Sequence, residues 1–137
     1  MREIKFHYIY QHGETGRFAD LCYTLDEIEK GHPARDASDR FNRYSLVARR
    51  QYTGVKDSKG VEIYEGDIVL LEEYYWGDTS KEDALAVTEW HEYDCGFVFR
   101  LIESCGGRLH VSEYTSKVVG NKYENPEKLK VWIRREL

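Results

Sequence analysis

The chain has few of the residues and runs that mark secreted or membrane-spanning proteins. Its 137 residues include three cysteines, two prolines and one methionine. No window approaches the roughly 20 apolar residues that a spanning helix needs, and the amino terminus has no apolar region of a secretory signal. An odd number of cysteines without such a signal indicates reduced thiols. We therefore expect a cytoplasmic protein with no membrane partner.

The chain also lacks an excess of positive charge. Its 20 lysines and arginines are outnumbered by 25 aspartates and glutamates, and the formal net charge is −5. A general nucleic-acid-binding protein is usually basic, because neutralising phosphates supplies most of its affinity. Nucleic acid therefore remains possible as a partner but is not favoured.

Aromatic residues are abundant, at 14% of the chain, and eleven of them are tyrosines. Tyrosine favours half-buried sheet surfaces and interfaces, because its ring packs while its hydroxyl needs a polar partner. A length of 137 residues suits one domain with one core. We expect a mainly β protein (α+β is possible) that forms a single domain over residues 1–137.

Alternation and turn residues predict about seven or eight short strands and about two or three short helices. The expected strands are 4–10, 44–53, 61–64, one that starts at Ile68 and is ended by 74–78, 87–93, 97–103 and 109–111, and the two further candidates are 18–22 and 114–119. Thr24 and Glu27 form a capping box that starts a helix over 25–30, and Gly31 ends it. Residues 81–86 form a short helix or an acidic loop, and the polar stretch 31–39 is the expected flexible loop.

Asn125 and Pro126 suit the cap and first position of a carboxy-terminal helix, although part of 125–137 could instead pair as a strand. Together these elements favour a compact SH3-like barrel or a small β-sandwich core with short helices.

Residues 51–69 form the most informative stretch. Asp57 and Gly60 bracket a two-residue turn, Gly54 precedes it, and Gly66 with Asp67 makes a second tight turn. We interpret these residues as a structural turn motif. The alternative is a carboxylate cluster of Asp57, Glu65 and Asp67, but their spacing differs from that of a calcium loop.

Three blocks of sequence resemble the YopX family of phage and prophage proteins. They are Met1–Phe6, Tyr52–Val69 and Val119–Glu127, in the family order, and the central block is the most specific. The chain departs from the pattern at His7–Tyr10 and in its tail, Arg134–Leu137. The resemblance implies a phage or prophage origin and an intracellular site. It implies no activity and no catalytic residue, because the family has no assigned biochemical role.

One group of residues has the chemistry of a zinc site: His91, Cys95, Cys105 and His110. Two such pairs, brought together by a hairpin, could form a tetrahedral site. Their spacing is not that of a common zinc finger, and both cysteines could simply be small buried residues. We therefore predict no metal and no cofactor, with these four residues as the weak alternative.

No motif in the chain predicts an enzyme. A nucleophile elbow, a phosphate loop and a dinucleotide fingerprint are all missing from the sequence. We predict a non-enzymatic accessory protein that binds a phage or host protein or forms a homo-oligomer, with Trp132 and Ile133 as contacts.

The second hypothesis is a regulatory or host-takeover factor that binds nucleic acid. Arg49 and Arg50 beside Tyr52 could contact a single strand. On a strand, the two arginines face opposite sides, so one should lie against a core or an interface. A small hydrolase is the third hypothesis.

Overall fold

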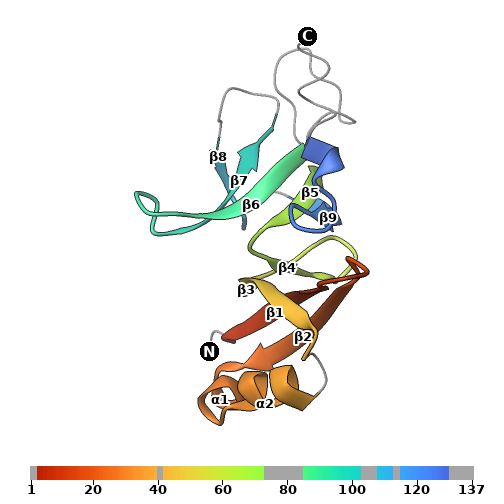
Figure 1. Ribbon diagram of the computed structural model, residues 1–137. Coiled ribbons are helices and arrows are strands. Elements are labelled where there is room, and N and C mark those ends of the chain that lie inside the picture. Colours follow the sequence, from red (N-terminus) through yellow and green to blue (C-terminus); the bar gives the residue numbers. More distant parts are fainter. Residues whose placement is uncertain (1–2, 40–41, 73–84, 103–107, 113–114, 130–137) are drawn as a thin grey trace. The chain divides into compact units, whose positions relative to one another are not determined.

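The computed structural model describes residues 3–39, 42–72, 85–102, 108–112 and 115–129 (Figure 1). The chain divides into two compact units, Met1–Tyr52 and Thr53–Leu137. Two compact units can still unfold as one cooperative domain, so the single domain over 1–137 stays a prediction.

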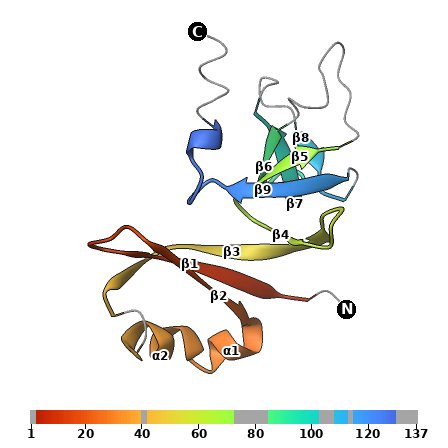
Figure 2. The same ribbon diagram turned by 90° about the vertical axis from the view of Figure 1, so that its right-hand side faces the viewer.

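The first unit is an antiparallel sheet with two short helices. Strands β1 (Lys5–His12) and β2 (Phe18–Thr24) form a hairpin, and β1 also pairs with β3 (Tyr44–Lys56). Helices α1 (Leu25–Glu29) and α2 (His32–Asp39) follow β2 and lie on one side of this sheet (Figures 1 and 2). A bulge in the β1–β3 pairing leaves Val47 opposite no residue of β1.

Helix α1 begins and ends as its sequence predicts. The Thr24 hydroxyl accepts from the Glu27 N–H at 3.3 Å, and the Thr24 N–H donates to the Glu27 carboxylate at 3.0 Å. Gly31, at a φ of +81°, follows the helix end, where glycine is the residue least strained.

The predicted loop over 31–39 is wrong, because its residues His32–Asp39 form α2. Pro33 lies in the first turn, where a missing N–H costs no helical hydrogen bond. The Tyr23 hydroxyl donates to the Asp36 carboxylate at 2.7 Å, so a tertiary contact fixes this polar segment to the sheet. The composition of residues 31–39 could not predict this contact, because its donor, Tyr23, lies in the preceding strand.

Tyrosines form the core of the first unit. Tyr8, Tyr10 and Tyr23 are buried together, and the rings of Tyr8 and Tyr23 meet edge to face at 5.1 Å between centroids. Four half-buried residues pack against them, namely Phe6, Leu21, Ile28 and Tyr44. The alternation of β1 therefore places the predicted apolar side of the strand against α1.

The second unit is built on a five-stranded antiparallel sheet. Its order is β8-β7-β6-β5-β9. The strands are β5 (Asp67–Leu71), β6 (Leu85–His91), β7 (Gly96–Leu101), β8 (Arg108–His110) and β9 (Ser116–Asn121). The end of β3 enters this unit and neighbours β4 (Glu62–Tyr64).

Aliphatic and phenylalanine side chains form the core of the second unit. Its buried members come from β4 to β7 and from the residue after β8: Ile63, Val69, Leu71, Ala86, Phe97, Phe99, Leu101 and Val111. Alternate residues of β7 point into this core, as the period of two requires. The core packs against the face of the β6–β7 hairpin that carries Ala86, Phe97 and Phe99.

The predicted mainly β class is confirmed, with short helices added to two antiparallel sheets. Within the described residues neither sheet closes on itself, so the barrel form of the prediction is not what these strands adopt. Leu85 and Ala86 belong to β6 rather than to a helix, and the rest of the expected 81–86 segment lies outside the described residues. In the carboxy-terminal segment, residues 127–129 are helical. No helix in the described ranges has the length and apolar character to cross a membrane.

Candidate functional site

The Asp57 carboxylate is the centre of the turn motif. Its Oδ1 accepts hydrogen bonds from the Lys59 and Val61 N–H groups at 2.9 and 2.8 Å, and its Oδ2 accepts from the Val118 N–H at 2.9 Å. Burial alone would raise the pKa of Asp57, but the three N–H donors and the charge of Lys117 lower this pKa below its usual value. Asp57 therefore joins the turn before β4 to strand β9.

Gly66 and Asp67 form a second junction with β9. Gly66 has a φ of +88°, a conformation that glycine adopts without strain. The Asp67 carboxylate accepts from the Tyr64 N–H at 2.8 Å, and the Gly66 carbonyl accepts from the Lys122 N–H at 2.9 Å. The predicted turn residues Gly54 and Gly60 also have positive φ, at +88° and +82°.

The closing block folds into a turn around Asn121. Its side-chain oxygen accepts from the Tyr123 and Glu124 N–H groups at 3.0 and 2.8 Å. The Asn125 side-chain oxygen in turn accepts from the Asn121 N–H at 3.2 Å. A Cβ on Gly120 would lie only 2.6 Å from that Asn125 oxygen, so a larger residue here would displace the Asn125 side chain.

The central and closing sequence blocks are therefore in direct contact, and backbone N–H groups donate to the carboxylates of Asp57 and Asp67. A carboxylate that accepts three backbone hydrogen bonds has little capacity left for a metal ion. This geometry supports the interpretation of these residues as a structural motif and gives no support to the carboxylate-cluster alternative.

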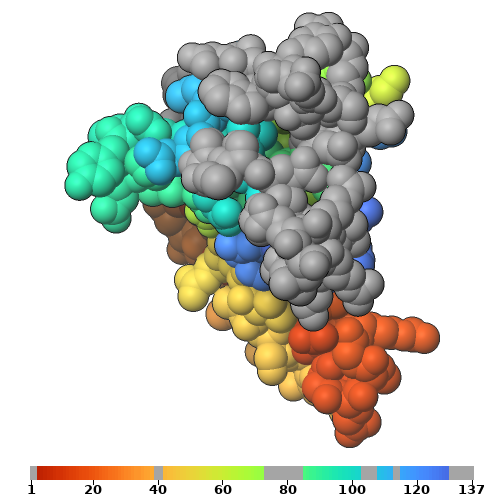
Figure 3. Space-filling view, turned by 90° about the horizontal axis from the view of Figure 1, so that it is seen from above, coloured from red at the N-terminus to blue at the C-terminus, as the bar shows by residue number. Residues whose placement is uncertain are grey.

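The most exposed aromatic residues of the described chain lie at the end of the β6–β7 hairpin. Tyr93 is 94% exposed and Trp90 is 46% exposed. The ring of Trp90 meets the buried ring of Phe97 edge to face at 5.2 Å, so the indole is held in place. We call Trp90, Glu92 and Tyr93 the hairpin patch. The end of this hairpin projects as the green lobe of the space-filling view (Figure 3).

Sequence reasoning missed the hairpin patch, although it predicted the strand that carries Trp90. Trp90 shares a face with the buried residues Ala86 and Thr88, so alternation alone suggests that it is buried too. Its position in the last ladder pairs before the turn, opposite Phe97, leaves half of it uncovered. The sequence signal that could have predicted the patch is the presence of two aromatic residues, Trp90 and Tyr93, next to a hairpin turn.

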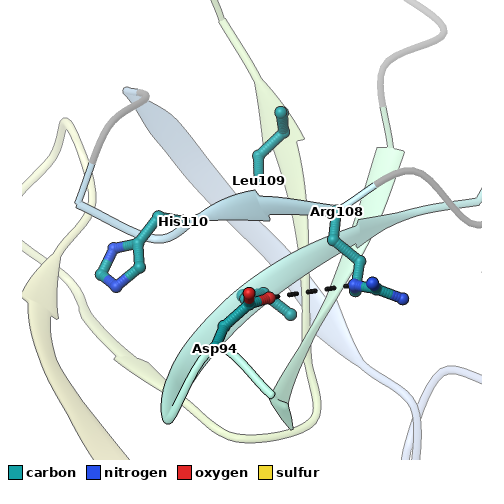
Figure 4. A pocket seen from close by; sticks show the side chains of 5 residues that line it. Asp94, Arg108, Leu109 and His110 are labelled. Carbon is teal, nitrogen blue, oxygen red and sulfur yellow. Dashed lines mark ion pairs between the residues drawn. The ribbon is translucent and has the colours of Figure 1, made fainter. Parts of the chain in front are cut away.

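A pocket of about 320 Å³ lies beside this hairpin and is lined by Asp94, Val98, Arg108, Leu109 and His110 (Figure 4). Asp94 Oδ2 lies 3.0 Å from His91 Nδ1 and 3.9 Å from Arg108 Nε. His110 Nδ1 lies 2.8 Å from the Ser112 hydroxyl. The charges that line the pocket are thus matched within the pocket itself.

The candidate zinc ligands engage other partners. His91 pairs with Asp94, and the Cys95 thiol donates to the Glu92 carbonyl at 3.3 Å. No group of three His, Cys, Asp or Glu side chains in the described residues could hold a metal ion. Because Cys105 lies outside these residues, the four-ligand alternative stays a prediction.

Of the predicted partner contacts, two are buried and one is exposed. Arg50 and Tyr52 are 4% and 5% exposed, and Arg50 Nη2 lies 3.4 Å from His7 Nδ1. Arg49 is exposed, with its guanidinium 5.9 Å from the centroid of the Tyr8 ring. The expectation that one of the two arginines is buried is therefore met by Arg50. Trp132 and Ile133 lie outside the described residues.

Comparison with known proteins assigns the family. A family model described as YopX protein matches residues 5–130. The chain belongs to the YopX family. The structural motif around Asp57 and Asn121 thus lies within the part of this YopX chain that the family model covers.

Among solved structures, the YopX chain is similar to protein EF1440 from Enterococcus faecalis. The two share 22% sequence identity over 89% of this chain and 74% of that chain, with a TM-score of 0.42. No curated protein matches the chain.

Proposed function

We propose that this YopX family protein is a non-enzymatic accessory protein of a phage or prophage. It acts in the host cytoplasm by binding another protein or copies of itself. The hairpin patch is its contact surface. This role fits the resemblance of its sequence to phage proteins without assigned chemistry.

The observation that supports the proposal is the exposed pair of aromatic side chains at the hairpin end, of which Trp90 packs on Phe97. Tryptophan and tyrosine dominate the energetics of protein interfaces, because they bury a large area at a small cost in conformational entropy. Trp90 already packs on Phe97, so little further ordering is needed when a partner binds.

The test is a tagged pull-down from prophage-induced host lysate, with and without nuclease, read by mass spectrometry. The wild-type protein should retain one stoichiometric partner that survives nuclease. Tyr93→Ala should lose most of it, because truncating an interface aromatic residue costs about 2 kcal/mol or more. If Tyr93→Ala retains the partner as well as the wild type does, the hairpin patch is not the contact surface.

Val61→Ala is the matched control variant. Val61 is an apolar residue of the same unit, is 49% exposed and lies away from the hairpin patch in sequence. It should retain the partner in full. A separate prediction from sequence is that deleting Val131–Leu137 lowers the mass of any oligomer, measured by light scattering.

Nucleic-acid binding is the runner-up, and the nuclease arm separates it from the proposal. A set of partners lost on nuclease treatment would favour it. Of the three residues that motivated it, only Arg49 is exposed, and burial of Arg50 and Tyr52 removes two of the expected contacts. Binding to a short single strand should then be measured at low salt, about 50 mM.

A further inference from the structure

A second exposed apolar surface lies on β3 in the first unit. Leu46 and Val47 are exposed, and Val47 occupies the bulge, where it has no residue of β1 opposite it. Arg49 is exposed two residues further along the same strand. We call Leu46, Val47 and Arg49 the strand patch. It combines apolar side chains with a positive charge.

The two patches carry opposite charge and lie on units of unequal charge. Residues 1–52 contain nine Lys and Arg against eight Asp and Glu, a net charge of +1, and residues 53–137 contain eleven against seventeen, a net charge of −6. In the hairpin patch, the Glu92 side chain is exposed. The strand patch offers the guanidinium of Arg49.

We propose that the hairpin patch of one copy docks against the strand patch of a second copy. Tyr93 and Trp90 would cover Leu46 and Val47, and Glu92 would pair with Arg49. An arginine also stacks well on exposed aromatic rings, so the aromatic and acidic groups of the hairpin recognise the same side chain. The inference rests on the proposed function and names a second copy as the partner.

This contact joins two different surfaces, and each docked copy has a second patch to use. The pair closes into a symmetric dimer where both hairpin patches reach a strand patch, and otherwise association continues into a larger ring or an open chain. Three residues on each side cover less than the roughly 800 Å² per partner of a standard interface. The association is therefore weak, depends on concentration and weakens with salt, because its charges are exposed.

The test uses two blocked variants and their mixture. The hairpin-blocked variant is Glu92→Lys with Tyr93→Ala, and the strand-blocked variant is Leu46→Ser with Arg49→Glu. Each variant alone should be a monomer of 16.2 kDa at about 100 μM by light scattering. Their equimolar mixture should form a complex of about twice that mass and nothing larger, because each variant retains the patch that the other lacks.

The wild type should exceed the single-chain mass at the same concentration. Raising NaCl from about 50 to about 500 mM should shift it toward the monomer. Val61→Ala should behave as the wild type does, and amide NMR spectra of both blocked variants should retain the dispersion of the folded protein. All four substituted residues are exposed or half-buried, so the fold should tolerate them.

A wild-type monomer at about 100 μM would overturn the inference. So would a mixture of variants that stays monomeric, or a blocked variant that still associates on its own. A monomeric wild type whose pull-down partner depends on Tyr93 would leave the proposed function standing and exclude self-association through these patches. A monomeric wild type that also has no pull-down partner dependent on Tyr93 would reject both proposals.

Discussion

The two units of this YopX chain have cores of different composition and are stabilised by different polar groups. In the first unit, tyrosine rings fill the space between the sheet and its helices, and a hydroxyl of this core bonds to a carboxylate of α2. In the second unit, aliphatic and phenylalanine side chains fill the core, while the carboxylate of Asp57 ties backbone segments at its edge.

The difference shows where each unit is vulnerable. The tyrosine core depends on hydroxyls that must stay protonated, whereas the junction around Asp57 depends on a carboxylate that must stay ionised. The central and closing sequence blocks typical of the family fall on the second kind of structure, whereas the opening block belongs to the first unit. The central and closing blocks therefore encode structural turns rather than a chemical site. The interaction surfaces that we propose lie outside these blocks.

The largest expected effect comes from a substitution in the second unit. Asp57→Ala leaves the N–H groups of Lys59, Val61 and Val118 without their acceptor, and should lower the free energy of unfolding by about 3 kcal/mol. Tryptophan fluorescence in a urea titration measures this, because all three tryptophans lie in residues 53–137.

Asp94→Ala is the matched control for Asp57→Ala. Asp94 is exposed, and its ion pairs with His91 and Arg108 are on the surface, so the change should stay within about 1 kcal/mol. Amide NMR signals of residues 5–39 report the first unit in the same titration. Coincident loss of both sets of signals would support one cooperative domain, and a loss below about 1 kcal/mol in Asp57→Ala would contradict the central role of its carboxylate.

A smaller effect is expected from Gly120→Ala in the closing turn. The added Cβ would lie 2.6 Å from the Asn125 side-chain oxygen, and relieving this overlap should cost about 2 kcal/mol. Asn125→Ala removes the side-chain oxygen and Cγ and leaves only the Cβ of residue 125, at 3.2 Å, so Gly120→Ala should cost much less in that background than in the wild type. Additive losses in that thermal-unfolding cycle would refute a direct clash.

In the first unit, Tyr23→Phe removes the hydroxyl that donates to Asp36. The loss should be about 1–2 kcal/mol, since the acceptor is charged. Hydrogen exchange of the α2 amides measures it, and the amides of β6 and β7 serve as the internal reference. Tyr23→Phe and Asp36→Ala should be strongly non-additive when combined. Equal protection of α2 in the wild type and in Tyr23→Phe would show that the bond does not hold this helix.

Changes of pH should have the smallest effect near neutrality and should destabilise a different unit at each extreme. The pKa of Asp57 is lowered in the folded state, so its contribution is present above the unfolded pKa, about 4, and is lost as the pH falls. Burial and then the Asp36 carboxylate raise the pKa of Tyr23, so its contribution is present below about pH 10 and is lost as the pH rises.

Acid should therefore weaken the second unit first, and alkali the first unit. Tryptophan fluorescence and the amide signals of residues 5–39 follow the two units separately during each titration. In Tyr23→Phe the alkaline loss in the first unit should decrease. An alkaline transition seen first in the tryptophan signal would reverse the assignment.

Local patterns predicted the elements whose signals lie within a few residues of one another. The capping box of Thr24 and Glu27, the turn at Asp57–Gly60 and the alternation of β1 each depend on neighbours in the chain. Helix α2 was mistaken for a loop, because a bond from Tyr23 holds its polar sequence in place and no local signal carries that bond.

The sequence by itself determined the β class, the turn chemistry and the family, because glycines with positive φ and alternating side chains restrict the backbone locally. Only the tertiary structure decided that Asp57 bonds to Val118, that Arg50 is buried while Arg49 is exposed, and that Trp90 lies half-uncovered at a hairpin end. These features depend on which distant segments meet, and burial is a property of the packed chain rather than of any one residue in it.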